Sequence, residues 1–295
     1  MSDLSPSDVW PNPELRDVAD YRSRQDRERL LRLFGTDAPV ALVTGSAAER
    51  VGCVVARHFL ARGYRVAFHA HKSLSRGRAI VAACGEAGLQ AHLVNGDVSD
   101  EKAVAGWVAE IQQRFGRLDA VVHCAASWEH KALVDTTADD LRRNLNEHTV
   151  AAFLLAKHCG LAMASQDAGG AVTLIGDWAI ERPYPDFAAY FAGKGSIPTL
   201  TRAMAVELAA ANPKVRVNAI LPGTVLLGEA AGEETAVPLR EATLVKRIGT
   251  PEDIAAAAIF LSESSFVTGV CLNVDGGRHC YAGPGVDAIA HPEVG

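Results

Sequence analysis

The sequence predicts an α/β protein built on a parallel sheet. Two observations carry this prediction: short β-branched runs alternate with segments of helical length, and the first run leads into a glycine-rich turn. The runs are apolar almost throughout, which is typical of strands covered on both faces. Because each run is followed by a helical segment, we expect right-handed crossovers between parallel strands.

The regular alternation begins at Pro39, so residues 38–277 are expected to form one domain. The spacing predicts strands at Val40–Thr44, Tyr64–Ala70, Gln90–Asn95, Ala120–Cys124, Ala171–Ile175, Val215–Ile220 and Val270–Val274. It predicts helices that include Val51–Arg62, Glu101–Phe115 and Ala188–Ala211. Residues 225–248 interrupt the pattern, and their glycine and proline content is typical of a flap over a substrate site.

The two ends of the chain differ from this domain. Residues 1–37 form an extension with one short helix between Tyr21 and Phe34, and residues 278–295 form a tail without a clear period. The helix has one apolar edge, made by Leu30, Leu31, Leu33 and Phe34. Acidic residues interleave with its basic ones, which favours a helix packed on a neighbour over a membrane-binding or calmodulin-binding one.

Composition disfavours several classes of protein. The formal net charge of −6 argues against a nucleic-acid surface, and no run of about 18 apolar residues predicts a membrane span. The N-terminus has neither the basic start nor the apolar stretch of a secretion signal. Six scattered cysteines without a CxxC pair indicate reduced thiols in a cytoplasmic protein rather than disulfides or a zinc ribbon.

The glycine-rich turn between Thr44 and Gly52 predicts a phosphate site. A turn of small residues between a strand and a helix lets a pyrophosphate approach backbone N–H groups at the helix N-terminus. Gly45 can supply the turn geometry, Gly52 can allow close helix–strand contact, and Arg50 adds a positive charge. A structural turn without a ligand is the alternative.

The end of the second strand indicates which cofactor would bind. An NAD site usually places an acidic residue here for the ribose 2′-hydroxyl, whereas this chain has His71, Lys72 and Ser73. Their donors and positive charge suit a 2′-phosphate, so we expect NADPH, with a solvated basic loop as the alternative. After the third strand, Asp97 precedes Val98; its carboxylate could accept from the adenine amino group or cap a helix that starts near Ser99.

Tyr190 and Lys194 are the candidate reacting pair. They are four residues apart on a predicted helix and therefore share one face. A phenol is a poor acid at neutral pH, but a neighbouring ammonium would lower its pKa. An ordinary amphipathic helix face is the alternative interpretation of this pair.

The order of four motifs resembles the short-chain dehydrogenase/reductase family from about Val40 to Gly277: the glycine turn, Asp97-Val98, the Tyr190–Lys194 pair, and Asn218-Ala-Ile-Leu-Pro-Gly223. The resemblance implies a doubly wound seven-stranded Rossmann-type sheet, and a homotetramer built on helices around 138–164 and 188–211. It implies proton transfer by Tyr190 and a contact from Lys194 to the nicotinamide ribose. With the charge argument above, the cofactor positions are Gly45, Ser46, Arg50, Val51, His71, Lys72, Ser73, Asp97, Val98, Cys124, Ala125, Tyr190, Lys194, Pro222 and Gly223.

Three positions depart from the family pattern. Asp177 stands where the family usually has a serine, and His123-Cys124-Ala125-Ala126 replaces an Asn-Asn-Ala-Gly run. His148 stands where the family usually has an asparagine, although a small register shift could bring in Asn144 or Asn146. His123, Cys124 and His148 lack metal-ligand spacing, so we expect packing roles for the first two, the asparagine role for His148, and no metal.

Asp177, Arg50 and the His-x-His-Lys-Ser segment recur in the pteridine and dihydromonapterin reductases, which the chain resembles in these features. That resemblance implies proton handling by Asp177 and Tyr190, stacking of Trp128 on a pterin ring, and an Arg50 that bridges cofactor phosphates and substrate. A core or subunit-contact role is the alternative for Trp128.

The expected function is therefore hydride transfer from NADPH to a C=O or C=N carbon of a small molecule, with a reduced pterin as the leading substrate class. A general ketone or acyl-ketone reductase is the alternative within enzymes. A non-catalytic NADPH-binding regulatory protein is the alternative outside them, since Asp177 and His148 depart from the family pattern.

Overall fold

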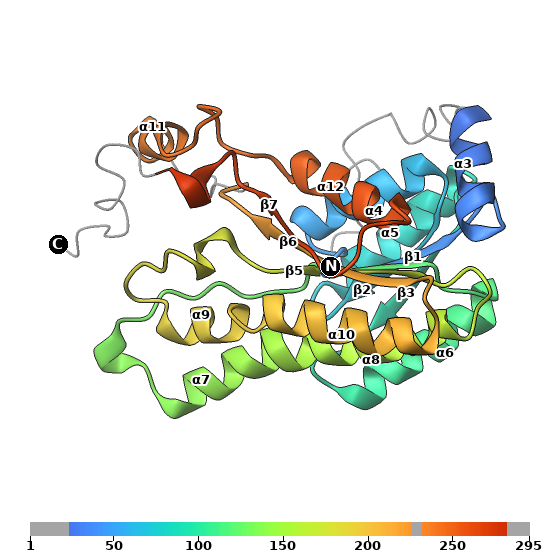
Figure 1. Cartoon of the computed structure of the whole chain (residues 1–295), viewed down its shortest axis with the longest axis horizontal. Helices are drawn as coiled ribbons and strands as arrows, with labels where there is room; N and C mark the ends of the chain where they lie inside the picture. Colours follow the sequence, from blue (N-terminus) through green and yellow to red (C-terminus); the bar gives the residue numbers. More distant parts are fainter. Residues whose placement is uncertain (1–23, 226–231, 282–295) are drawn as a thin grey trace.

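The computed structural model describes residues 24–225 and 232–281 and contains a seven-stranded parallel sheet with helices on both faces (Figure 1). This arrangement confirms the predicted fold. The strand order is β3-β2-β1-β4-β5-β6-β7, so the chain winds outward from β1 in both directions. The strands are β1 Val40–Thr44, β2 Arg65–Ala70, β3 Ala91–Asn95, β4 Ala120–His123, β5 Gly170–Ile175, β6 Val215–Pro222 and β7 Cys271–Val274.

The helices cover the sheet in two layers, each over its own apolar core. The helices are α3 Arg24–Phe34, α4 Val51–Arg62, α5 Leu74–Glu86, α6 Glu101–Phe115, α7 Ala138–Asn144, α8 Ala151–Ala164, α9 Ala188–Lys194, α10 Ile197–Ala211, α11 Glu233–Glu241 and α12 Pro251–Glu263. Successive strand residues point to opposite faces: Leu42 joins the core under α6, α8 and α10, whereas Val43 joins the core under α4, α5 and α12.

Short turns complete the fold near the carboxyl ends of the strands. Three are 3-10 helices: η1 Leu133–Asp135, η3 Trp178–Ile180 and η4 Arg278–Cys280. The fourth, η2 Leu145–Val150, is a π-helical turn that joins α7 to α8. Such turns are frequent at functional sites, and η2 faces α9.

The single helix expected over residues 188–211 is instead two helices, α9 and α10. Pro198 lies in the first turn of α10. Because proline has no N–H and its ring clashes with the carbonyl four residues earlier, a helix cannot run through it undisturbed. The break lies just after Lys194, which ends α9.

Helix α3 packs against the domain, as its apolar edge predicts. Leu30 and Phe34 are buried against α4 and Tyr64, while Leu31 is exposed. Residues 1–23, six residues of the expected flap (226–231) and residues 282–295 lie outside the described part of the chain. Within that part, no helix is long and apolar enough to cross a membrane.

Candidate active site

Tyr190 and Asp177 are joined directly. The Tyr190 hydroxyl of α9 donates to Oδ2 of Asp177 at 2.6 Å, and Asp177 follows the end of β5. The other carboxylate oxygen accepts from the backbone N–H of Ala179 at 2.8 Å and caps η3. Both carboxylate oxygens are thus held, which fixes the direction in which the phenol points.

Burial dominates the proton affinities of this pair. It raises the pKa of Asp177 above its ordinary value, although the bond from Tyr190 acts in the opposite sense. Burial also raises the pKa of Tyr190, and the Asp177 charge adds to that rise. In the protein without a cofactor, burial and the Asp177 charge therefore outweigh any lowering of the Tyr190 pKa by Lys194.

Lys194 lies one turn from Tyr190 and is 4% exposed. Its Nζ donates to the carbonyl of Ile175, the last residue of β5, at 2.8 Å. Burial lowers the pKa of Lys194 to about 8, against the opposing effect of the Asp177 charge. The Lys194 ammonium and the Tyr190 phenol therefore both extend from α9 toward the carboxyl end of β5.

His148 packs against the other side of Tyr190. The two rings are edge to face with centroids 5.3 Å apart, and neither nitrogen of the buried imidazole has a hydrogen-bond partner among the described residues. Burial lowers the pKa of His148 to about 3, so the ring is neutral at physiological pH. Asn144 is buried and its side chain donates to the Asp140 carbonyl of its own helix, whereas Asn146 is exposed.

The glycine-rich turn is closely fitted to the strand beside it. Gly45 has φ +67°, and a Cβ there would lie 3.0 Å from Cα of Ala125. A Cβ on Gly52 would lie 2.9 Å from the carbonyl oxygen of Thr44. These glycines are required by contact as well as by turn geometry. Arg50 is exposed at the N-terminus of α4 and makes no side-chain cap there.

His69 was not among the predicted site residues, yet it holds this turn from the penultimate position of β2. Its Nδ1 accepts from the backbone N–H of Gly45 at 3.0 Å, and its Nε2 lies 3.1 Å from the carbonyl of Gly96. This pairing assigns the proton to Nε2. Burial lowers the pKa of His69 to about 4, so the ring stays neutral. A histidine in an otherwise apolar strand was the one available signal.

The residues expected near the adenosine are only partly as predicted. His71 and Lys72 are exposed after β2, and Ser73 lies at the N-terminus of α5 without a cap bond. Asp97 does not cap α6: its Oδ1 accepts from N and Oγ of Ser99, each at 2.8 Å. The cap is Asp100, which accepts from the first-turn N–H groups of α6. Val98 packs against the core.

The remaining predicted cofactor positions surround the same strand ends. Ser46 is buried, with its hydroxyl bonded to the Val43 carbonyl, and Val51 begins α4. Cys124 lies against Gly52, and Pro222 ends β6. A Cβ on Gly223 would lie 2.7 Å from Cα of Asp275. Among residues 24–225 and 232–281, no group of three His, Cys, Asp or Glu side chains could hold a metal ion.

Trp128 is 63% exposed, so it is not a core residue. Its ring stacks on Phe187 with centroids 4.8 Å apart and an interplanar angle of 20°. Phe187 in turn contacts the ring of Tyr184 edge to face. The exposed Trp128 ring therefore lies on an aromatic cluster of the loop that precedes Tyr190.

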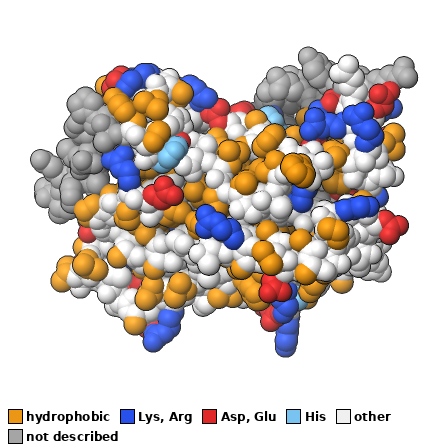
Figure 2. All heavy atoms as spheres, viewed as in Figure 1, with side chains coloured by type: hydrophobic (Ala, Val, Ile, Leu, Met, Phe, Trp, Pro, Cys, Tyr) orange, Lys and Arg blue, Asp and Glu red, His pale blue; other side chains and the backbone are white. Residues whose placement is uncertain are grey.

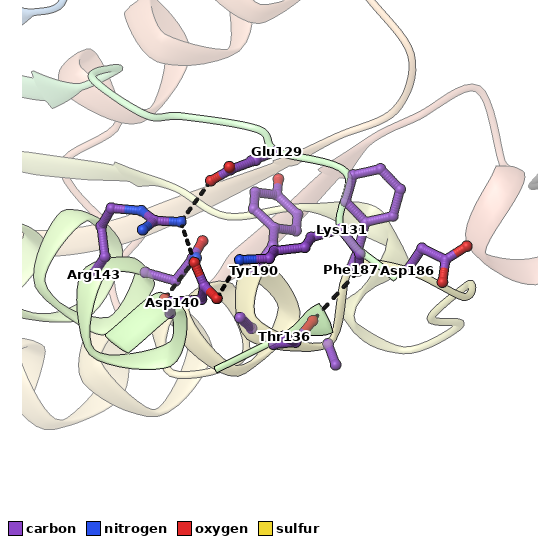
Figure 3. A pocket seen from close by; sticks show the side chains of 11 residues that line it. Glu129, Lys131, Thr136, Asp140, Arg143, Asp186, Phe187 and Tyr190 are labelled. Atoms are coloured by element: carbon purple, nitrogen blue, oxygen red, sulfur yellow. Dashed lines mark hydrogen bonds and ion pairs between the residues drawn. The ribbon is translucent and has the colours of Figure 1, made fainter. Parts of the chain in front are cut away.

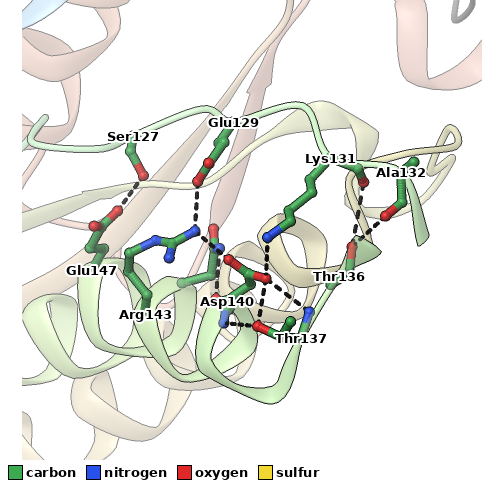
Figure 4. A network of polar contacts seen from close by, with 10 residues as sticks. Ser127, Glu129, Lys131, Ala132, Thr136, Thr137, Asp140, Arg143 and Glu147 are labelled. Carbon is green, nitrogen blue, oxygen red and sulfur yellow. Dashed lines mark hydrogen bonds and ion pairs between the residues drawn. The ribbon is translucent and has the colours of Figure 1, made fainter. Parts of the chain in front are cut away.

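Hydrogen bonds and ion pairs hold the segment that carries Trp128. Its alternate residues 127, 129 and 131 bond to η2 and α7 (Figure 4). The pairs are Ser127 with Glu147, Glu129 with Arg143 at 2.7 Å, and Lys131 with Asp140 at 2.6 Å.

Asp140 is the centre of this network. Its carboxylate is almost fully buried and also accepts from the backbone N–H and hydroxyl of Thr137. The bond from Lys131 is the largest of several contacts that lower the pKa of Asp140 far below its ordinary value. A small pocket between this network and Tyr190 is lined by residues of both, including Phe187 (Figure 3).

Comparison with known proteins identifies relatives along most of the chain. A family profile described as enoyl-(acyl carrier protein) reductase matches residues 45–279. An oxidoreductase of Mycobacterium tuberculosis described as uncharacterized is 33% identical over 84% of this chain and 95% of its own length. A 3-oxoacyl-(acyl-carrier-protein) reductase of Bos taurus is 32% identical over 77% and 92%. The crystal structure of a candidate gluconate dehydrogenase from Agrobacterium tumefaciens superposes with a TM-score of 0.76 at 27% identity, covering 85% and 98%.

Proposed function

This chain belongs to the short-chain dehydrogenase/reductase family of oxidoreductases, and we propose that it uses NADPH to reduce a C=O or C=N carbon of a small molecule. The observation that carries the proposal is the 2.6 Å bond between Tyr190 and Asp177, with Lys194 one turn away at the same strand end. Tyr190 and Asp177 form a buried pair of acidic groups. Beside a glycine-rich turn, such a pair supplies a proton donor next to a dinucleotide site.

The glycine turn fits a dinucleotide. Gly45 and Gly52 leave no room for a Cβ, and the open N-terminus of α4 with the exposed Arg50 suits phosphate oxygens. When bound, NADPH supplies the hydride. Preference for NADPH over NADH is supported by the exposed Lys72 and by Arg76 of α5, which reaches Glu49 in the turn at 3.2 Å.

The chain's own residues would manage the proton. Tyr190 donates its hydroxyl proton to the substrate atom that gains electron density, and Asp177 orients the phenol and serves as a second proton carrier. Lys194 holds the nicotinamide ribose. His148 fixes the back of the Tyr190 ring as a neutral packing partner.

A reduced pterin is the substrate class we favour. The exposed ring of Trp128, stacked on Phe187, offers a planar surface, and Asp177 offers acceptor oxygens to the N–H groups of an amide-rich ring. Arg50 would reach both cofactor phosphates and substrate. An acyl-ketone reductase is the second candidate, favoured by the likeness to the bovine 3-oxoacyl reductase.

We further propose a cytoplasmic homotetramer. Phe153 and Leu161 of α8 and Val206 of α10 are large apolar side chains that are 41%, 52% and 72% exposed. Figure 2 shows apolar side chains spread over the face on which these helices lie. Their burial between subunits would supply an apolar interface.

The test of function is oxidation of NADPH and NADH by the purified chain, measured by absorbance, with dihydropterins, ketones and a 3-oxoacyl thioester. Faster NADPH oxidation with a dihydropterin supports the leading proposal. Tight NADPH binding without turnover of any compound supports the non-catalytic alternative instead.

A further inference from the structure

Arg278 lies between two segments that form the proposed site. It begins η4, after β7, and its guanidinium carbon is 4.3 Å from the ring centre of Trp178. Its Nη1 donates to Oγ1 of Thr224 at 2.8 Å. Trp178 directly follows Asp177, and Thr224 directly follows Gly223. Arg278 therefore bridges the ends of β5 and β6 beside the acid pair.

The guanidinium of Arg278 is buried with part of its donor set unused. The residue is 9% exposed, and its Nε is fully buried without a hydrogen-bond partner in the described part of the chain. Its Nη2 donates to no residue of the described ranges but is not among the buried unpaired atoms, so it keeps contact with solvent. Asp177 and Asp275 act on this charge only from beyond ion-pair distance.

Arg216 shows how this fold treats another buried arginine. It is 7% exposed, and its two terminal nitrogens donate to the carbonyls of Leu261 and Ser262 at 2.6 Å each. A buried guanidinium left without such partners costs several kcal/mol. Arg278 bears this desolvation cost next to Tyr190 and Asp177. Its unused donors therefore indicate that it binds a ligand there rather than serving a structural role.

The free donors also indicate which ligand. Nη2, which keeps contact with solvent, can donate a charge-assisted bond to a carboxylate oxygen, and Nε lies on the same edge of the planar guanidinium. We propose that Arg278 is a specificity-determining residue that binds a carboxylate group of the substrate. The inference rests on the proposed function in one respect: it assigns this carboxylate to the substrate that Tyr190 protonates.

The experiment measures binding to the protein saturated with NADP⁺ by calorimetry, with two matched pairs of probes. One pair is 5-oxohexanoate and its methyl ester, and the other is 6-carboxypterin and 6-methylpterin. The parent protein is compared with Arg278→Met, Arg278→Lys and Arg32→Met, which removes an exposed arginine charge from α3.

We expect the parent to bind at least one acid about 100-fold more tightly than its neutral partner, as a charge-assisted bond from Arg278 allows. Arg278→Met should abolish that preference, Arg278→Lys should keep part of it, and Arg32→Met should leave it unchanged. Arg278→Met should also unfold close to the temperature of the parent, since removal of the buried charge offsets the lost contacts with Thr224 and Trp178.

Equal binding of acid and neutral partner by the parent, or binding of neither acid, overturns the proposal. A lower unfolding temperature of Arg278→Met, with equal losses for both partners, overturns it as well. Turnover of the probes with NADPH is measured separately. An acid preference without turnover leaves the carboxylate site standing and contradicts the proposed reductase.

Discussion

Replacing Lys194 with methionine should stabilise the protein at neutral pH while removing activity. Burial lowers the pKa of Lys194 from 10.5 to about 8. At about 1.4 kcal/mol for each pKa step of one, the buried ammonium costs about 3 kcal/mol of folding free energy. Methionine recovers this cost but leaves the Ile175 carbonyl without its 2.8 Å bond, a loss of about 1 kcal/mol. The net gain at pH 7 is about 2 kcal/mol.

The stability gain from Lys194→Met depends on pH. Below pH 8 lysine is charged in the folded and unfolded chains, so the full cost is present. Between pH 8 and 10.5 the folded lysine is neutral while the unfolded one is still charged, so the parent gains stability as pH rises. The advantage of Lys194→Met should therefore vanish by about pH 10.

Urea unfolding of the parent and Lys194→Met at pH 7 and pH 10 measures both points. Lys157→Met is the matched control, because Lys157 is 38% exposed and its surface contact with Glu101 is worth little. A variant that is less stable than the parent at pH 7, or a difference that does not change with pH, would refute the assigned burial cost. NADPH affinity and turnover should both fall in Lys194→Met, since the ribose contact is lost with the charge.

Three further substitutions test other parts of the site. Lys72→Asp should weaken NADPH binding and spare or improve NADH binding in fluorescence titrations; equal affinity of the parent for both cofactors would sink this prediction. Asp177→Asn should lower kcat/KM for a dihydropterin about 100-fold, and Asp177→Ser should shift preference toward small ketones; a fully active Asp177→Asn would make the carboxylate structural. His69→Gln should remove part of the stability loss that we expect between pH 6.5 and pH 4, because burial holds the pKa of His69 at about 4, as it also lowers those of His123 and His148, and the unfolded chain takes up the proton first. His92→Gln, on the exposed edge, is its control, and an unchanged acid profile in His69→Gln would count against this role.

Much of the fold was predictable because strands that are buried on both faces consist almost entirely of apolar residues. The seven apolar runs match the strands to within two residues at each end. The break between α9 and α10 was missed although Pro198 signalled it. The contacts of residues 127, 129 and 131 also have a signal in the sequence, since Ser127, Glu129 and Lys131 alternate with the aromatic rings of Trp128 and His130.

The contacts of the site were less predictable, because they depend on how strand ends come together. Spacing placed Tyr190 beside Lys194, but the direct bond to Asp177 spans 13 residues through a loop. The sequence left two opposing effects on the Asp177 pKa, and only the packed structure shows that burial prevails. No spacing rule connects Arg278 to Trp178, because 100 residues separate them.

Tyr190 is the proposed proton donor of the reductase reaction. NADPH oxidation and NADPH binding are measured for Tyr190→Phe beside Tyr64→Phe, whose hydroxyl is buried on the other side of the sheet and has no hydrogen-bond partner among the described residues. We expect Tyr190→Phe to lose at least about 100-fold in kcat while it binds NADPH like the parent, and Tyr64→Phe to keep both properties. A Tyr190→Phe protein that retains most of the parent's kcat would contradict the account.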